Sequence, residues 1–81
     1  MKFTIVERKT KISEDLRAYA TKKVQKLDRY FPDDSDATLT FAELKGKQTV
    51  EVTVKRSGMI YRAEETTSDM YGSIDGAVAK L

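Results

Sequence analysis

Hydrophobic and polar residues alternate along four short segments of the chain, which is the pattern of β-strands that bury one face. The clearest segment is VEVTVK at residues 50–55, where valine occupies every second position. The other three predicted strands span residues 2–7, 38–41 and 59–63. Lys45-Gly46-Lys47 and Ser57-Gly58 are typical of tight turns, so the second, third and fourth strands must form an antiparallel meander.

The stretch between the first two strands carries a helical pattern, with hydrophobic residues every three or four positions. Its apolar stripe is formed by Leu16, Ala20, Val24, Leu27 and Phe31. Ser13 is the expected N-cap, and the two acidic residues that follow it suit the positive end of a helix. Pro32 cannot extend the helix, which is therefore predicted from about residue 14 to about residue 31, before a polar connection at residues 33–36.

A second helical pattern ends the chain, with an apolar stripe formed by Met70, Ile74, Val78 and Leu81. Thr67 or Ser68 is the expected N-cap, with Asp69 in the first turn. Because neither glycine nor proline follows the stripe, we expect the helix to continue to the last residue.

The predicted order of elements is β-α-β-β-β-α, which defines an α+β domain of two layers. We expect a four-stranded sheet with both helices on one face, since each helix has a single apolar stripe to bury. The other face of the sheet should stay polar, and its expected residues are Thr38, Thr40, Glu51 and Thr53.

Length and hydropathy limit the number of domains and the kinds of protein that the chain can be. A chain of 81 residues buries enough surface for one modest core, so residues 1–81 are expected to form a single domain. No stretch approaches the roughly 18 apolar residues that span a bilayer, and the first residues lack a cleavable signal pattern. We therefore expect a cytoplasmic protein without a membrane partner.

The inventory of side chains argues against catalysis. Cysteine and histidine are both absent, which removes disulfides, thiolate metal ligands and the commonest general base. The adjacent acids Glu64 and Glu65 should point to opposite faces of a strand, and the four glycines are scattered instead of forming a phosphate-binding loop. We predict no enzyme, no catalytic residues, no metal site, no cofactor and no small-molecule substrate.

Charge is distributed unevenly along the chain. Residues 1–62 carry fourteen Lys and Arg against nine Asp and Glu, a net charge of +5. Residues 63–81 carry one lysine against four acids, a net charge of −3. A basic body with an acidic last quarter indicates an anionic partner that is met by one side of the molecule.

The polar side of the first predicted helix holds the strongest candidate for binding such a partner. Lys22, Lys26 and Arg29 fall at i, i+4 and i+7, on one line of a regular helix. A neighbouring stripe alternates aromatic and basic side chains, Tyr19, Lys23, Lys26 and Tyr30. Cations that meet phosphates, next to rings that can stack, are typical of an RNA-binding surface. The alternative is a solvated helix face whose lysine stems cover apolar surface.

Two further basic clusters lie outside the helix. The first, in the loop before it, consists of Arg8, Lys9 and Lys11, for which RNA binding and simple solvation are equally open. Lys45 and Lys47 flank a predicted hairpin turn, where lysines commonly keep sheet edges from aggregating, and we favour that interpretation. RNA binding on the sheet, as in RNA-recognition motifs, is not expected, because Phe41 shares a face with the core residue Leu39 and the strand order differs.

The most specific sequence signals lie in two segments, ISEDLRAYATKKVQKLDRYF at residues 12–31 and GMIYRAEETTSDMYGSIDGAVAKL at residues 58–81. Their most distinctive parts are Ser68-Asp69-Met70-Tyr71, followed by Ile74 and Asp75, and Lys23-x-x-Lys26-Leu27. With the strands between them, they resemble the N-terminal domain of the ribosome hibernation-promoting factor and ribosome-associated inhibitor family. The resemblance covers nearly the whole chain and implies the β-α-β-β-β-α fold, which is similar to double-stranded RNA-binding domains.

The resemblance also implies a partner and a site. Domains of this family bind the small ribosomal subunit in the channel for mRNA and tRNA through basic residues that contact rRNA, with ribosomal proteins as further candidate partners. Carried over position by position, the rRNA-binding residues are Lys22, Lys23, Lys26, Arg29 and Lys80. Lys22 stands where some relatives carry an acid. The implied function is inhibition of translation by a ribosome hibernation factor in stressed or stationary cells.

Two departures from the family pattern bear on the organisation of the protein. Family members extend the last helix with further Lys and Arg, and longer members add a domain that pairs ribosomes. We therefore expect this chain to be the N-terminal, ribosome-binding domain of a longer protein. Two alternatives stay open from the residues, a general double-stranded RNA-binding module and a protein-interaction module whose basic helix docks on an acidic protein.

Overall fold

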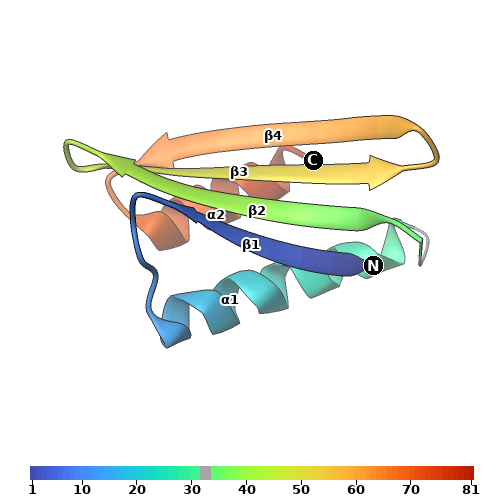
Figure 1. Cartoon of the computed structure of the whole chain (residues 1–81), viewed down its shortest axis with the longest axis horizontal. Helices are drawn as coiled ribbons and strands as arrows, with labels where there is room; N and C mark the ends of the chain where they lie inside the picture. The colour runs from blue at the N-terminus through green and yellow to red at the C-terminus, as the bar shows by residue number, and fades with distance from the viewer. Residues whose placement is uncertain (32–33) are drawn as a thin grey trace.

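The computed structural model describes residues 1–31 and 34–81 of the chain. Its elements are β1 (Lys2–Arg8), α1 (Glu14–Gln25), a 3-10 helix η1 (Lys26–Arg29), β2 (Asp36–Leu44), β3 (Lys47–Arg56), β4 (Met59–Thr67) and α2 (Met70–Ala79). The strands form one four-stranded sheet in the order β1-β2-β3-β4. Both helices lie on the same side of this sheet (Figure 1), so the predicted β-α-β-β-β-α order and the two-layer α+β architecture are confirmed.

The strand pairing follows from the lengths of the connections. Strand β1 runs parallel to β2, because α1 carries the chain back along the sheet between them. The turns that join β2, β3 and β4 are tight, and these strands pair antiparallel as predicted. Both turns have positive φ at their two linking residues, 51° and 80° at Lys45-Gly46 and 49° and 79° at Ser57-Gly58. This is the type I′ backbone, whose twist matches that of the flanking strands.

Alternation along the central strands decides which face of the sheet is buried. The fully buried residues of β2 and β3 beneath the helices are Leu39, Phe41, Val50, Val52 and Val54. They pack in one core with the helix residues Leu16, Ala20, Val24, Met70, Ile74 and Ala77. On the opposite face the register pairs Thr38 with Thr53 and Thr40 with Glu51, which gives the polar surface that the sequence predicts.

The first helix is shorter than its hydrophobic pattern predicts. It ends at Gln25, and the chain then tightens into η1 instead of continuing as an α-helix to residue 31. A 3-10 helix also brings residues i and i+3 to one side, so Leu27 stays buried and the apolar spacing does not distinguish the two helix types. Ser13 is the N-cap, as predicted. Pro32, the predicted stop, and residue 33 of the predicted connection lie outside the described residues.

Both ends of the last helix also differ from the prediction. The N-cap is Asp69, not Thr67 or Ser68, and its carboxylate accepts two backbone N–H groups of the first turn, at 3.2 and 3.4 Å. Thr67 is not the cap because it is still the last residue of β4, which is longer than the predicted strand. The helix ends at Ala79, and Leu81 packs partly buried against the core without being helical.

Candidate nucleic-acid interface

Three cations of the basic edge predicted for the first helix are exposed and have no acidic partner among the described residues. Lys22 in α1 and Lys26 and Arg29 in η1 are exposed. Within residues 1–31 and 34–81, none of the three lies within 4 Å of an acidic group. Residues three apart are eclipsed in a 3-10 helix, so Lys26 and Arg29 project along one line. We call these three residues the helix edge.

Lys23, next to Lys22 in α1, is held differently. Its Nζ lies 3.4 Å from Oδ1 of Asp75 in α2 and 5.4 Å from the centre of the Tyr19 ring. The Tyr19 hydroxyl donates a hydrogen bond of 2.7 Å to the same Asp75 oxygen, and its ring meets that of Tyr71 edge to face, with the centres 5.0 Å apart. We call Tyr19, Lys23, Tyr71 and Asp75 the interhelical cluster. It joins α1 to α2 and leaves the Lys23 charge shared with a carboxylate.

Asp75 fixes the protonation of its two neighbours. Its hydrogen bond and its negative charge raise the pKa of Lys23 above the ordinary 10.5, and its hydrogen bond also raises the pKa of Tyr19 above the ordinary 10.0. A raised pKa in the folded state favours the protonated form. The resulting contribution to folding is therefore present below the ordinary pKa and is lost as the pH rises through the raised one. The cluster keeps its ammonium and phenol groups throughout the neutral range.

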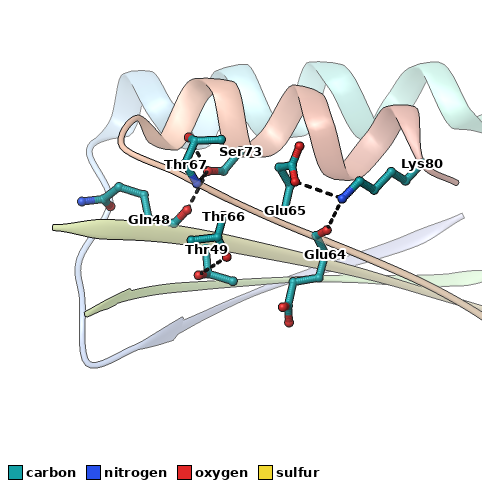
Figure 2. A network of polar contacts seen from close by, with 8 residues as sticks. All are labelled: Gln48, Thr49, Glu64, Glu65, Thr66, Thr67, Ser73 and Lys80. Atoms are coloured by element: carbon teal, nitrogen blue, oxygen red, sulfur yellow. Dashed lines mark hydrogen bonds and ion pairs between the residues drawn. The ribbon is translucent and has the colours of Figure 1, made fainter. Parts of the chain in front are cut away.

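Lys80, a contact predicted on the last helix, lies just beyond its end and is turned back onto the sheet (Figure 2). Its Nζ lies 2.9 Å from Oε1 of Glu65 and 3.0 Å from the backbone oxygen of Glu64 in β4. Glu65 lies against α2 at Gly76, where a Cβ would stand 2.5 Å from Oε2 of Glu65. Figure 2 also shows the side chains of Glu64 and Glu65 on opposite faces of β4, as predicted. The charge of Lys80 is thus shared with a carboxylate, like that of Lys23.

Contacts of Ser73 and Asp75, which hold α2 against the sheet and against α1, were not predicted from the sequence. Ser73 of α2 is fully buried and donates a hydrogen bond of 2.6 Å to the backbone oxygen of Gln48 in β3. Its hydroxyl accepts the backbone N–H of Thr67 at 3.1 Å, so it fastens α2 to the neighbouring strands (Figure 2). The only feature of the sequence that could have indicated this contact is the position of Ser73 on an otherwise apolar stripe. Asp75 gives no such signal, because its partners lie on another helix.

The surface as a whole offers positive charge and aromatic rings. Across residues 1–31 and 34–81, no three His, Cys, Asp or Glu side chains come together as metal ligands. The same residues include no helix with the length and apolar character needed to cross a membrane. What they do provide is an edge of three cations beside a cluster of tyrosines and a shared lysine. This combination suits contacts with phosphates, ribose hydroxyls and bases.

The fold and this surface define a small α+β domain suited to an anionic partner. Residues 3–81 match the family described as Sigma 54 modulation protein / S30EA ribosomal protein, and the chain belongs to this family. It is 37% identical to the ribosome hibernation promotion factor of Lactococcus lactis subsp. cremoris, with 100% of this chain and 45% of that protein covered. It is 32% identical to the ribosome hibernation promoting factor of Acidithiobacillus ferridurans, with 93% and 100% covered.

Solved structures of similar proteins have the same fold. The Thermus thermophilus Protein Y N-terminal domain superposes with a TM-score of 0.88 at 32% identity, over 100% of this chain and 91% of that one. A ribosomal subunit interface protein from Coxiella burnetii superposes with a TM-score of 0.86 at 26% identity, over 100% and 89%. The family predicted from the sequence is confirmed. The chain spans less than half the length of the Lactococcus lactis relative.

Proposed function

We propose that this chain is the ribosome-binding domain of a hibernation factor, which binds the small ribosomal subunit and inhibits translation in stressed or stationary cells. The observation that carries the proposal is the helix edge, three exposed cations without an acidic partner among the described residues, on a chain of this family. The partner is rRNA in the cytoplasm, with ribosomal proteins as additional neighbours. The proposal includes a place as the N-terminal domain of a longer protein.

The proposed mechanism is occupation of space. Lys22, Lys26 and Arg29 neutralise rRNA phosphates in the channel that mRNA and tRNA use, and the body of the domain, 37 × 22 × 20 Å, fills part of that channel. Tyr30, which is 67% exposed beside η1, offers a ring for stacking on a base. Translation substrates are excluded while the domain stays bound, and no covalent bond is made or broken.

Lys23 and Lys80 are secondary contacts in this proposal. Each shares its charge with a carboxylate, that of Asp75 at 3.4 Å and that of Glu65 at 2.9 Å. An RNA phosphate must displace this carboxylate or share the cation with it, so each of the two lysines contributes less than an unpaired cation. The proposed rRNA-binding site therefore consists of three primary cations on the helix edge and two lysines, Lys23 and Lys80, each of which exchanges its carboxylate partner for an RNA phosphate.

Sedimentation of the chain with purified small ribosomal subunits, in sucrose gradients at several salt concentrations, tests the proposal. Each neutralised phosphate contributes about −0.7 to −0.9 to the slope of log affinity against log salt, so the helix edge alone accounts for a slope of roughly −2 to −3. We also expect subunits that already carry mRNA and tRNA to bind the chain much more weakly, because the channel is occupied.

Two outcomes would contradict this function and favour one of the alternatives. Binding that is insensitive to both salt and nuclease would favour a protein-interaction module that docks on an acidic protein. Equal affinity for a naked hairpin RNA and for small subunits would favour a general double-stranded RNA-binding module. Competition between the hairpin RNA and small subunits in one gradient distinguishes a general RNA-binding module from a ribosome-binding domain.

Replacing Asp75 by asparagine should strengthen binding to small subunits. The asparagine oxygen can still accept the Tyr19 hydroxyl, but no carboxylate competes with phosphate for Lys23. One more effective cation should make the slope of log affinity against log salt steeper by about 0.7–0.9. Glu51→Gln is the matched control, because it removes the partner of Arg62 on the open face of the sheet and should leave the slope unchanged. Weaker binding by Asp75→Asn would show that the pair with Lys23 is needed for binding.

A further inference from the structure

Two lysines hold a backbone conformation that other residues adopt more readily. Lys9 has a φ of 57° and Lys45 a φ of 51°, and the third non-glycine residue with positive φ in the described part of the chain is Ser57, at 49°. This left-handed region is strained for most side chains, whereas glycine and asparagine tolerate it. Lys45 also opens a type I′ turn, where asparagine before glycine is the favoured pair. The chain keeps lysine where asparagine would fold better.

These two lysines lie in loops at the same end of the molecule. Lys9 follows β1 and Lys45 follows β2. Because β1 and β2 are parallel, with Arg8 opposite Ala42, the two strands end on the same side (Figure 1). Flanking cations bring the group to five exposed side chains, which we call the loop-end cluster: Arg8, Lys9, Lys11, Lys45 and Lys47.

The loop-end cluster carries positive charge without an acidic partner in the part of the chain that the structure describes. Across residues 1–31 and 34–81, none of its five cations lies within 4 Å of an acidic group. The nearby Glu7 accepts a backbone N–H at 2.8 Å and pairs with Arg17 at 3.7 Å, and Glu43 accepts a side-chain amide. The remaining acids at this end stand at helix N-termini: Glu14, Asp15 and Asp69. The cluster is therefore available to an external anion.

Protection of exposed strand edges, the interpretation favoured for Lys45 and Lys47 from the sequence, stays an alternative to anion binding. The two lysines flank the turn between the central strands β2 and β3, and this hairpin extends beyond the last pairs with the outer strands, Arg8 with Ala42 and Gln48 with Thr67. Beside this turn, a surface depression is lined by Lys45, Gly46, Lys47, Thr66, Thr67 and Ser68. A second depression is lined by Glu7, Lys9, Thr10 and Lys11. Ammonium and hydroxyl groups of this kind donate hydrogen bonds to phosphate oxygens.

We propose that the loop-end cluster is a second RNA-phosphate-binding surface of the domain, in addition to the helix edge. The inference rests on the proposed function, because both surfaces meet the same rRNA. Along α1, Lys22 of the helix edge lies eight residues beyond Glu14, about 12 Å at 1.5 Å per residue. Lys26 and Arg29 follow the end of this 12-residue helix, about 18 Å from its start, in a molecule 37 Å long. Phosphate contacts at both ends fix the orientation of the bound domain, whereas one cluster alone fixes only its position.

Substitution of the strained lysines by asparagine, Lys9→Asn and Lys45→Asn singly and together, tests this inference. Ser57→Asn is the control, because Ser57 has the same left-handed backbone in the other hairpin and carries no charge. All three substitutions should raise the Tm by roughly 2–4 °C each, since asparagine is favoured there. The double lysine variant should bind purified small subunits about a hundredfold more weakly, with a slope of log affinity against log salt less steep by about 1.4–1.8. Ser57→Asn should leave binding unchanged.

Higher stability with weaker binding supports the inference, because loss of structure cannot explain it. The same change of slope on protein-free small-subunit rRNA assigns the contact to RNA. A change seen only with intact subunits would place an acidic ribosomal protein at the cluster and overturn the RNA assignment. Unchanged binding by the double variant, where the wild-type chain binds, overturns this inference alone. A wild-type chain that does not bind small subunits overturns the proposed function as well.

Discussion

Replacing Lys22, Lys26 and Arg29 together by glutamine should abolish co-sedimentation of the chain with small ribosomal subunits and leave its fold intact. A hydrogen bond to a charged group contributes roughly 1.5–3 kcal/mol, so the loss of three should weaken binding by about a thousandfold or more. The three side chains are exposed, and their removal leaves no buried group without a partner. Sedimentation measures the binding, and thermal unfolding followed by circular dichroism checks the fold.

A second triple variant separates the position of the charge from its amount. Lys2, Lys55 and Arg62 are exposed and share the open face of the sheet with Thr38 and Thr53, as the strand register shows. Their replacement by glutamine removes the same charge from the face opposite the helices. Charges more than a Debye length away, about 8 Å at physiological salt, are largely screened, so the affinity should change little. Equal losses in both variants would mean that the helix edge is misassigned.

Replacing Leu39 by alanine should remove a large part of the stability of the domain. Leu39 is fully buried in β2, between Ile5 of β1 and Val52 of β3. Such a substitution costs roughly 2–5 kcal/mol, whereas a domain of this length has about 4–12 kcal/mol in total. At an m value of about 1 kcal/mol/M, the midpoint of urea unfolding should fall by roughly 2 M or more. Circular dichroism across a urea series measures this midpoint.

The same strand supplies the control for that experiment. Leu44 is also in β2, but its side chain is 73% exposed. Leu44→Ala removes the same atoms without leaving a cavity, so the free energy of unfolding should stay within about 0.5 kcal/mol of the original value. Since the two substitutions are chemically identical, any difference reports burial alone. A similar loss at both positions would be inconsistent with the described register of β2.

How much of the fold the sequence predicts depends on the kind of signal. Alternation predicted the existence and the buried face of β2 and β3, because each has one face under the helices and the other open, but both strands are longer than predicted. The helix ends were not predictable in the same way. Thr67, Ser68 and Asp69 are all good N-cap residues, and the pairing of Thr67 with Gln48 across the sheet excludes the first of them. The residue types around a helix start do not show which of them pairs with a distant strand.

The same distinction holds for the candidate site. The exposure of Lys22, Lys26 and Arg29 follows from spacing along one chain segment. Their predicted alignment on one regular α-helix is wrong, because the chain changes to a 3-10 helix after Gln25. The partners of Lys23 and Lys80 could not be predicted, because each pair joins two separate elements. Tyr19 and Asp75, for example, are 56 residues apart in the chain. Periodicity within α1 and within α2 does not determine which of their residues face one another.

The change of helix type after Gln25 has a geometric consequence for RNA. Three residues advance about 6 Å along the axis of a 3-10 helix, against about 4.5 Å in an α-helix, where they would also be rotated by about 60°. The backbone positions of Lys26 and Arg29 therefore stand one above the other, about 6 Å apart along the axis. In the proposed interface, this alignment directs the two cations to neighbouring phosphates of one RNA strand, instead of splaying them around the helix.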